Sequence, residues 1–224
     1  MNKHSVRFLQ LAAGLSLVAV AIAARSTAGS AAPLVPAPIV DNKLSSSSGE
    51  EVAVLAGGCF WGVESVFRHT KGVKVAVSGF AAGNAASLNK QVNPGSTAYV
   101  ETVRIVFDPS VISYGQVLRI FFGVIHDPTQ LNRQGPDVGA EYRSEIFFQS
   151  DAQRKIVEAY IAQLTKADVF AKPIVTLISP KSSFKVAPAA HQNYAEMHPD
   201  DPYIVANDAP KVERLRADFP ELYK

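Results

Sequence analysis

Hydrophobic and polar residues alternate along several short segments of the chain, and these segments are predicted to form β-strands. In the clearest one, 98–110, the recurring Val100, Thr102, Ile105 and Phe107 indicate a strand that ends near a proline. In a second segment the alternating residues are Val73, Val75 and Val77. The predicted strands cover 51–58, 72–80, 98–110, 144–150 and 173–179.

Apolar residues at helical spacing predict helices between these strands. Phe60, Val63, Val66 and Phe67 recur as they would on one face of a helix over 59–69. Further helices are predicted over 113–126, 151–167, 187–198 and 209–219, the first two with serine caps. The order of the elements predicts an α+β sandwich in which helices pack on a sheet. The long polar segments 81–97 and 127–143 are predicted to be loops, the first a candidate site loop.

The N-terminus differs in pattern from the rest of the chain. Lys3, His4 and Arg7 precede an uncharged apolar run that ends in small residues, which predicts a signal peptide over 1–24. An uncleaved membrane anchor is the alternative, because the run is nearly long enough to span a bilayer. Export to the periplasm or another extracytoplasmic site follows from the signal peptide. The Ala/Ser/Pro-rich stretch 25–50 is predicted to be a flexible linker, so the folded domain is expected over 51–224.

Composition and charge exclude some classes of function. The chain has 224 residues, 47% of them hydrophobic, which suits one globular domain. A net charge of +2, without a dense basic run, argues against a nucleic-acid-binding protein. His126, Asp127, His191 and His198 show no close metal-ligand spacing, so no metal site is expected, and His126 is interpreted as a structural loop histidine.

Cys59 is the only cysteine and follows two glycines at the predicted junction of a strand and a helix. The positive end of a helix dipole favours the thiolate, which is the nucleophilic form. The pattern therefore indicates an activated nucleophile. A buried thiol that acts as a small hydrophobic residue is the alternative. Phe60 and Trp61 beside it are either core residues or an apolar cup for a small group such as a methyl.

Several separated motifs run in order from about Val52 to the C-terminus. They are GGCFWGVE, VRIVFDPSVISYGQVL, HDPTQLNRQGPDVG, YRS, PIVT, HQNY and PYIVANDAPKVERL. Together they resemble the motifs of the peptide methionine sulfoxide reductase A family. The resemblance implies a ferredoxin-like two-layer sandwich with a mixed β-sheet, packed helices and a long C-terminal coil. It also implies reduction of the S-epimer of methionine sulfoxide, free or in oxidised proteins, by a monomer without metal or organic cofactor.

The resemblance also implies a role for each matching residue. The Cys59 thiolate attacks the sulfoxide sulfur and becomes a sulfenic acid, while Glu101 supplies the proton that the oxygen needs. That role requires a raised pKa, which burial in an apolar strand would produce, although alternation alone leaves open which way Glu101 faces. The substrate-binding residues implied by the family are Phe60, Trp61, Asp137, Tyr142 and Tyr203.

The chain departs from the family pattern at several positions. Asn89 stands where a tyrosine is usual, Phe80 and Ala82 alter the GYAGG stretch, and Tyr99 replaces a histidine. Ile204 follows Tyr203 where many members carry a resolving cysteine. The sulfenic acid is therefore expected to be reduced by an external thiol, either a small one or a thioredoxin- or glutaredoxin-like protein.

Two other functions remain open from the residues alone. A thiol redox sensor with a weakened site would use Cys59 without turning over a sulfoxide. A cysteine hydrolase would combine Cys59 with His191 and Asp137 as a triad.

Overall fold

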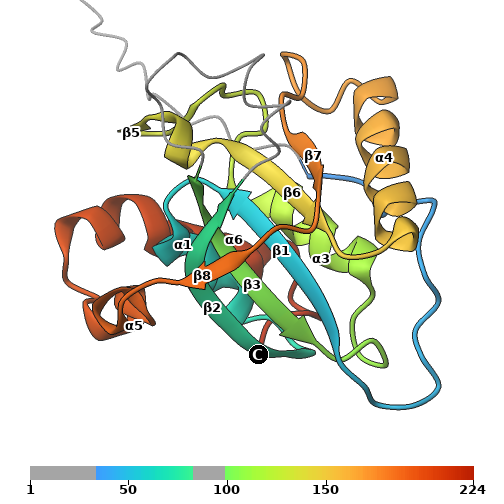
Figure 1. The fold of residues 1–224 in the computed structure, drawn as a ribbon, viewed down its shortest axis with the longest axis horizontal. Helices are drawn as coiled ribbons and strands as arrows, with labels where there is room; N and C mark the ends of the chain where they lie inside the picture. Colours follow the sequence, from blue (N-terminus) through green and yellow to red (C-terminus); the bar gives the residue numbers. More distant parts are fainter. Residues whose placement is uncertain (1–33, 83–98) are drawn as a thin grey trace, which may run out of the picture. The chain divides into compact units, whose positions relative to one another are not determined.

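A six-stranded sheet forms the centre of the domain. The computed structural model describes residues 34–82 and 99–224, and the sheet order is β7-β6-β1-β3-β2-β8 (Figure 1). Neighbouring strands are antiparallel except β6 and β7, so the predicted mixed sheet is confirmed. The strands are β1 Glu51–Gly57, β2 Val73–Ala82, β3 Tyr99–Phe107, β6 Ser144–Phe148, β7 Leu177–Pro180 and β8 Phe184–Val186. A separate short hairpin pairs β4 Arg133–Gln134 with β5 Asp137–Val138.

Helices pack on one face of this sheet and enclose the main core. The helices are α1 Phe60–Arg68, α3 Tyr114–Ile120, α4 Asp151–Lys166, α5 Tyr194–Met197 and α6 Ala209–Asp218. Leu55 of β1 and Ile105 of β3 share this core with Phe67 and Val157 from the helices. A smaller apolar cluster around Phe147 lies apart from this core. The α+β class is confirmed, while the ferredoxin-like arrangement stays a prediction.

Several element boundaries differ from those predicted. A β-bulge between Val73 and Val75 interrupts the alternation in β2, so Val75 is 47% exposed while Ala76 is buried. The strand predicted over 173–179 is confined to Leu177–Pro180 and is not the last, because β8 follows it. The helix predicted over 113–126 divides into α3 and a buried π-helix, η1, at Phe121–Ile125.

The described part of the predicted linker, 34–50, is not a flexible tether. Val35 is completely buried in the main core, and the Tyr160 hydroxyl donates a hydrogen bond of 2.7 Å to the Pro36 carbonyl. Asp41 accepts hydrogen bonds at the start of α3, from the Gly115 N–H at 2.8 Å and from the Ser113 hydroxyl. The segment lacks helices and strands, but its side chains and carbonyls are bound to the domain.

Some predicted segments cannot be compared with the structure. The predicted signal peptide, the first part of the linker and most of the loop 81–97 lie outside the described residues. Within 34–82 and 99–224, no helix combines the length and the hydropathy needed to cross a bilayer.

Candidate active site

Cys59 lies at the junction of β1 and α1, as the sequence predicts. Gly58 adopts a φ of +96°, which favours glycine, and a Cβ there would lie 2.7 Å from the Gln134 side chain. Cys59 is the N-cap residue of α1. The two glycines thus allow the chain to turn from the sheet into the helix directly before the sulfur.

The thiol itself differs from the prediction. Its side chain is largely buried, with 8% exposure for the residue, and burial and the nearby Glu101 carboxylate raise the pKa of Cys59 to about 12. Asp208 acts in the same direction, whereas the Trp61 backbone N–H and the Tyr203 hydroxyl lower the pKa. Desolvation and the two carboxylates thus act against the thiolate that the helix terminus favours.

Glu101 faces the nucleophile from β3. It lies two residues before Val103 on the strand and so shares a face with Val103, Ile105 and Phe107, all of which are buried in the helix-covered core. Its Oε2 accepts a hydrogen bond of 3.0 Å from the Phe60 N–H, one residue from the sulfur. Burial raises the pKa of Glu101 to about 7, with smaller contributions from Asp137 and Glu141, while the Phe60 hydrogen bond lowers it.

The two aromatic residues after Cys59 have different surroundings. Phe60 is buried in the core and meets the Phe80 ring edge-on, with 5.6 Å between the ring centroids. Trp61 is only partly buried, and its indole stacks on Tyr194 at 3.8 Å. Trp61 also meets the Tyr203 ring edge-on at 5.8 Å. Both residues contribute to an aromatic cluster beside the sulfur.

The remaining predicted site residues come from the 137–142 loop and the C-terminal coil. The Tyr203 hydroxyl donates a hydrogen bond of 2.5 Å to Asp137 Oδ2, which joins two segments far apart in the sequence. Tyr142 ends a short 3₁₀ helix in this loop, and burial together with Glu101 raises its pKa to about 12. The structure thus brings the seven predicted residues together, while Asn89 lies outside the described residues.

Other residues of this region were missed by the sequence analysis. The Asp201 carboxylate accepts hydrogen bonds from the Tyr194 hydroxyl at 3.0 Å and from the Tyr203 N–H at 2.8 Å. It therefore connects the tyrosine stacked on Trp61 to the tyrosine bound to Asp137. The HQNY and PYIV motifs contain or adjoin these residues, but nothing in their pattern shows that they meet.

Two of the histidines considered as metal ligands or as a catalytic base, His126 and His191, have other contacts in the structure. His126 is half-buried, and its two ring nitrogens bond to the Phe121 carbonyl at 3.1 Å and the Ser144 hydroxyl at 2.7 Å. Burial lowers the pKa of His126 to about 4, as for a neutral structural histidine. The His191 ring lies against Phe60 and Trp61, and no hydrogen bond described for it joins Cys59 or Asp137. Among the described residues, no group of three potential ligands is placed to hold a metal ion.

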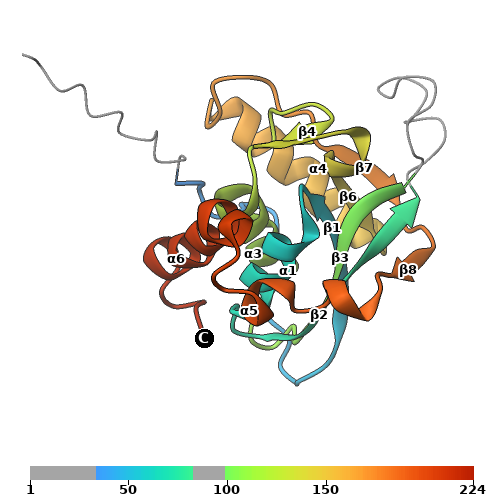
Figure 2. The ribbon, with the colours of Figure 1, turned by 90° about the vertical axis from the view of Figure 1, so that its left-hand side faces the viewer.

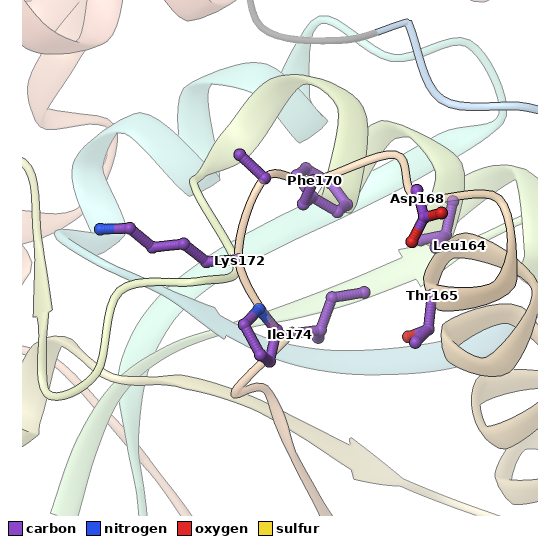
Figure 3. A pocket seen from close by; sticks show the side chains of 8 residues that line it. Leu164, Thr165, Asp168, Phe170, Lys172 and Ile174 are labelled. Carbon is purple, nitrogen blue, oxygen red and sulfur yellow. The ribbon is translucent and has the colours of Figure 1, made fainter.

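A cavity of about 250 Å³ lies elsewhere in the domain. It is formed where α4 ends, between Leu164 and Ile174, and the Lys172 side chain extends away from the other labelled residues (Figure 3). None of the predicted site residues lines it. The candidate active site is therefore the surroundings of Cys59 and not this cavity.

Comparisons with known proteins agree with this site. The family model for peptide methionine sulfoxide reductase matches residues 51–222. Proteins named peptide methionine sulfoxide reductase MsrA 2, from Mesorhizobium japonicum and Synechocystis, are 49% and 41% identical to this chain. The first match covers 78% of this chain and 90% of the relative, and the second covers 85% and 91%.

Solved structures are similar as well. The reduced form of Mxr1 from Saccharomyces cerevisiae is 28% identical with a TM-score of 0.58, covering 71% of this chain and 94% of that one. Methionine sulfoxide reductase A of Corynebacterium diphtheriae is 30% identical with a TM-score of 0.52, covering 75% and 85%. By its family match and by the identity of its relatives, the chain belongs to the peptide methionine sulfoxide reductase family.

Proposed function

We propose that this protein is an oxidoreductase that reduces the S-epimer of methionine sulfoxide, free or within proteins, to methionine. The observation that carries the proposal is the pairing of Cys59 with Glu101. The Phe60 N–H binds the Glu101 carboxylate, and this places a carboxyl group with a pKa of about 7 beside the only cysteine of the chain. Family membership supports the same reaction.

The reaction transfers one oxygen atom between two sulfurs. At neutral pH the thiol holds its proton, because burial and the Glu101 carboxylate raise its pKa to about 12, and Glu101, with a pKa of about 7, can both accept and donate a proton. Glu101 accepts the thiol proton as the Cys59 sulfur attacks the sulfoxide sulfur, and then donates it to the oxygen. The attack forms a bond between the two sulfurs. This bond and the sulfur–oxygen bond of the substrate then break as the oxygen, now a hydroxyl, bonds to the Cys59 sulfur. The substrate sulfur is reduced, the Cys59 sulfur is oxidised to a sulfenic acid, and methionine leaves.

The aromatic cluster and the tyrosines position the substrate for this attack. Phe60 and Trp61 provide apolar surface for the S-methyl group. Tyr142 provides a hydroxyl that stays protonated at neutral pH, because burial raises its pKa. Asp137 and Tyr203, bound to each other, close the site on the side of the C-terminal coil. These roles follow the pattern of the family.

An external thiol regenerates the enzyme. The sequence contains a single cysteine, so the sulfenic acid has no partner within the chain. Two equivalents of a small thiol, or one thioredoxin- or glutaredoxin-like dithiol, reduce the sulfenic acid to thiol and water and become a disulfide. We propose that this takes place outside the cytoplasm, on the basis of the predicted signal peptide, and that the protein acts as a monomer.

The test is product analysis with each sulfoxide epimer and dithiothreitol. We expect methionine from the S-epimer only, and none from a Cys59→Ser variant, which keeps the size of the side chain but loses the nucleophile. Turnover by Cys59→Ser would contradict the proposal. Loss of the free thiol with peroxide but not with either sulfoxide would instead identify a redox sensor.

A further inference from the structure

A buried carboxylate near Cys59 has no role in the mechanism above. Asp208 ends the π-helix η4, Ile204–Asp208, directly before α6, and its side chain is completely buried. Its Oδ1 forms an ion pair of 2.9 Å with Lys211 Nζ. Its Oδ2 is buried and has no hydrogen-bond donor among the described residues. Burying a carboxylate with one unpaired oxygen costs free energy, which suggests that its charge has a function at this position.

Asp208 lies directly against the first turn of α1. A Cβ on Gly62 would lie only 2.1 Å from Asp208 Oδ1 and 2.8 Å from Lys211 Nζ, so the close approach depends on a glycine there. Gly62 is three residues after Cys59, and both α6 and η4 contact α1 (Figure 2). The negative charge of Asp208 therefore lies at the helix terminus that carries the sulfur.

We propose that Asp208 is an electrostatic positioning residue, whose carboxylate, seated on Gly62 and held by Lys211, opposes the positive end of α1 and adds to burial and Glu101 in keeping Cys59 a thiol in the resting site. A thiol reacts far more slowly with oxidants than a thiolate does. The arrangement thus protects the only cysteine until a substrate is bound. The inference deepens the proposed function, because it rests on Cys59 being the nucleophile.

At neutral pH the other groups around Cys59 supply only part of the negative charge that raises its pKa, although Glu101, when ionised, acts more strongly than Asp208. Glu101 is partly protonated there, since burial raises its pKa to about 7. Tyr142 is neutral for the reason given above, and His126, at the end of η1, is neutral because burial lowers its pKa to about 4. Asp137 is bound to the Tyr203 hydroxyl. Burial raises the pKa of Asp208, but the adjacent Lys211 ammonium lowers it and stabilises the ionised form.

The test measures the reactivity of the thiol without any sulfoxide. The full chain, reduced, is alkylated with iodoacetamide between pH 6.5 and 9.5, where the single cysteine makes the product unambiguous. In Asp208→Asn the curve of rate against pH should move to lower pH by at least about half a unit, or about threefold in rate at a fixed pH. Asp218→Asn is the matched control, because it removes a carboxylate at the far end of α6 that pairs with Arg214 at 3.1 Å, and its curve should not move.

Trp61, the only tryptophan, separates an effect of charge from a loosened site. Its emission should stay at the wild-type wavelength in Asp208→Asn, because the stacking on Tyr194 does not involve Asp208. An unmoved alkylation curve, or a moved curve with red-shifted emission, would overturn the proposal. If Asp208→Asn does not fold, Asp208→Ser removes the same charge with a smaller polar side chain and is judged by the same two measurements. Neither readout needs sulfoxide turnover, so failure here is distinct from failure of the proposed function.

Discussion

At the scale of single residues, Glu101 determines what the site can do chemically. Its side chain faces the buried side of β3, where it binds the first N–H of α1. The same burial raises its pKa to about 7 and, together with Glu101 itself, raises that of Cys59 to about 12. Between these two values the pair holds a single proton. The reactive arrangement, a thiolate beside a protonated carboxyl, then needs only a transfer of that proton within the site.

Replacing Glu101 by Gln tests this shared proton. In the wild type, the rate of methionine formation should rise with pH until about 7, as the Glu101 carboxyl loses its proton and can accept the one on Cys59. Above that pH the rate should level off. Gln keeps an acceptor for the Phe60 N–H but cannot move a proton, so we expect a rate at pH 7 at least about 10²-fold lower. The inflection near pH 7 should disappear, because only the thiol still titrates.

The measurement is methionine release between pH 5.5 and 9 at saturating sulfoxide. Glu141→Gln is a suitable control, because Glu141 raises the pKa of Glu101 without a bond to the α1 terminus. Its profile should keep the inflection at a slightly lower pH. A Glu101→Gln profile that still levels off near pH 7 would assign the shared proton to another group.

At the scale of elements, one glutamine attaches the C-terminal coil to the sheet. The Ser78 N–H of β2 donates to Gln192 Oε1 at 3.1 Å, and Gln192 Nε2 donates to the Ser78 and Ala187 carbonyls at 2.9 and 3.0 Å. The neighbouring Asn193 N–H donates to Glu64 on α1. These bonds hold the coil where Tyr194 stacks on Trp61.

Gln192→Ala should therefore weaken both the fold and substrate binding. Three hydrogen bonds are lost and the buried Ser78 N–H is left without an acceptor, which costs about 1–3 kcal/mol of unfolding free energy. Because Tyr194 loses its support, the KM for sulfoxide should rise at least about threefold, with a smaller change in kcat.

Gln163→Ala is the matched control, to be compared by urea unfolding and steady-state kinetics. Gln163 also bonds to two backbone groups, at Ala37 and Ile39, but it lies on α4 away from the site. It should lower stability and leave KM unchanged. Equal KM values for the two variants would refute a role of the coil in binding.

The elements also show what the sequence can and cannot predict. Local patterns correctly indicate β1, as a continuous apolar run, and α1, β3 and α4, by their periodicity. Periodicity has limits, however. It does not reveal the β2 bulge, since one added residue reverses which side chains face the core. It also misses β8, whose three residues form a strand only because β2 lies beside them. The contacts of Asp201 and Asp208 likewise depend on how the C-terminal coil returns to α1.

At the scale of the whole molecule, the domain extends beyond the segment that periodicity and the family model delimit. Both begin at residue 51, yet Val35 lies in the main core and Arg119 Nε donates to its carbonyl at 3.1 Å. A Cβ on Gly123 would meet the Val35 side chain at 2.8 Å, so the fit against η1 is tight. The Ala/Ser/Pro-rich composition of 25–50 conceals this contact, because one buried valine produces no periodic pattern.

Val35→Ala should consequently destabilise the entire domain. The change removes two buried methyl groups from a tightly packed site, which is expected to lower the unfolding free energy by about 1.5–3 kcal/mol. Leu34→Ala is the control, since Leu34 is 65% exposed and loses little packing. Urea unfolding followed by Trp61 emission measures both variants. Since Val35 has no part in the site, kcat and KM should stay at wild-type values below the transition. A Val35→Ala variant as stable as Leu34→Ala would mean that residues 34–50 contribute nothing to folding, and that the domain begins at residue 51 after all.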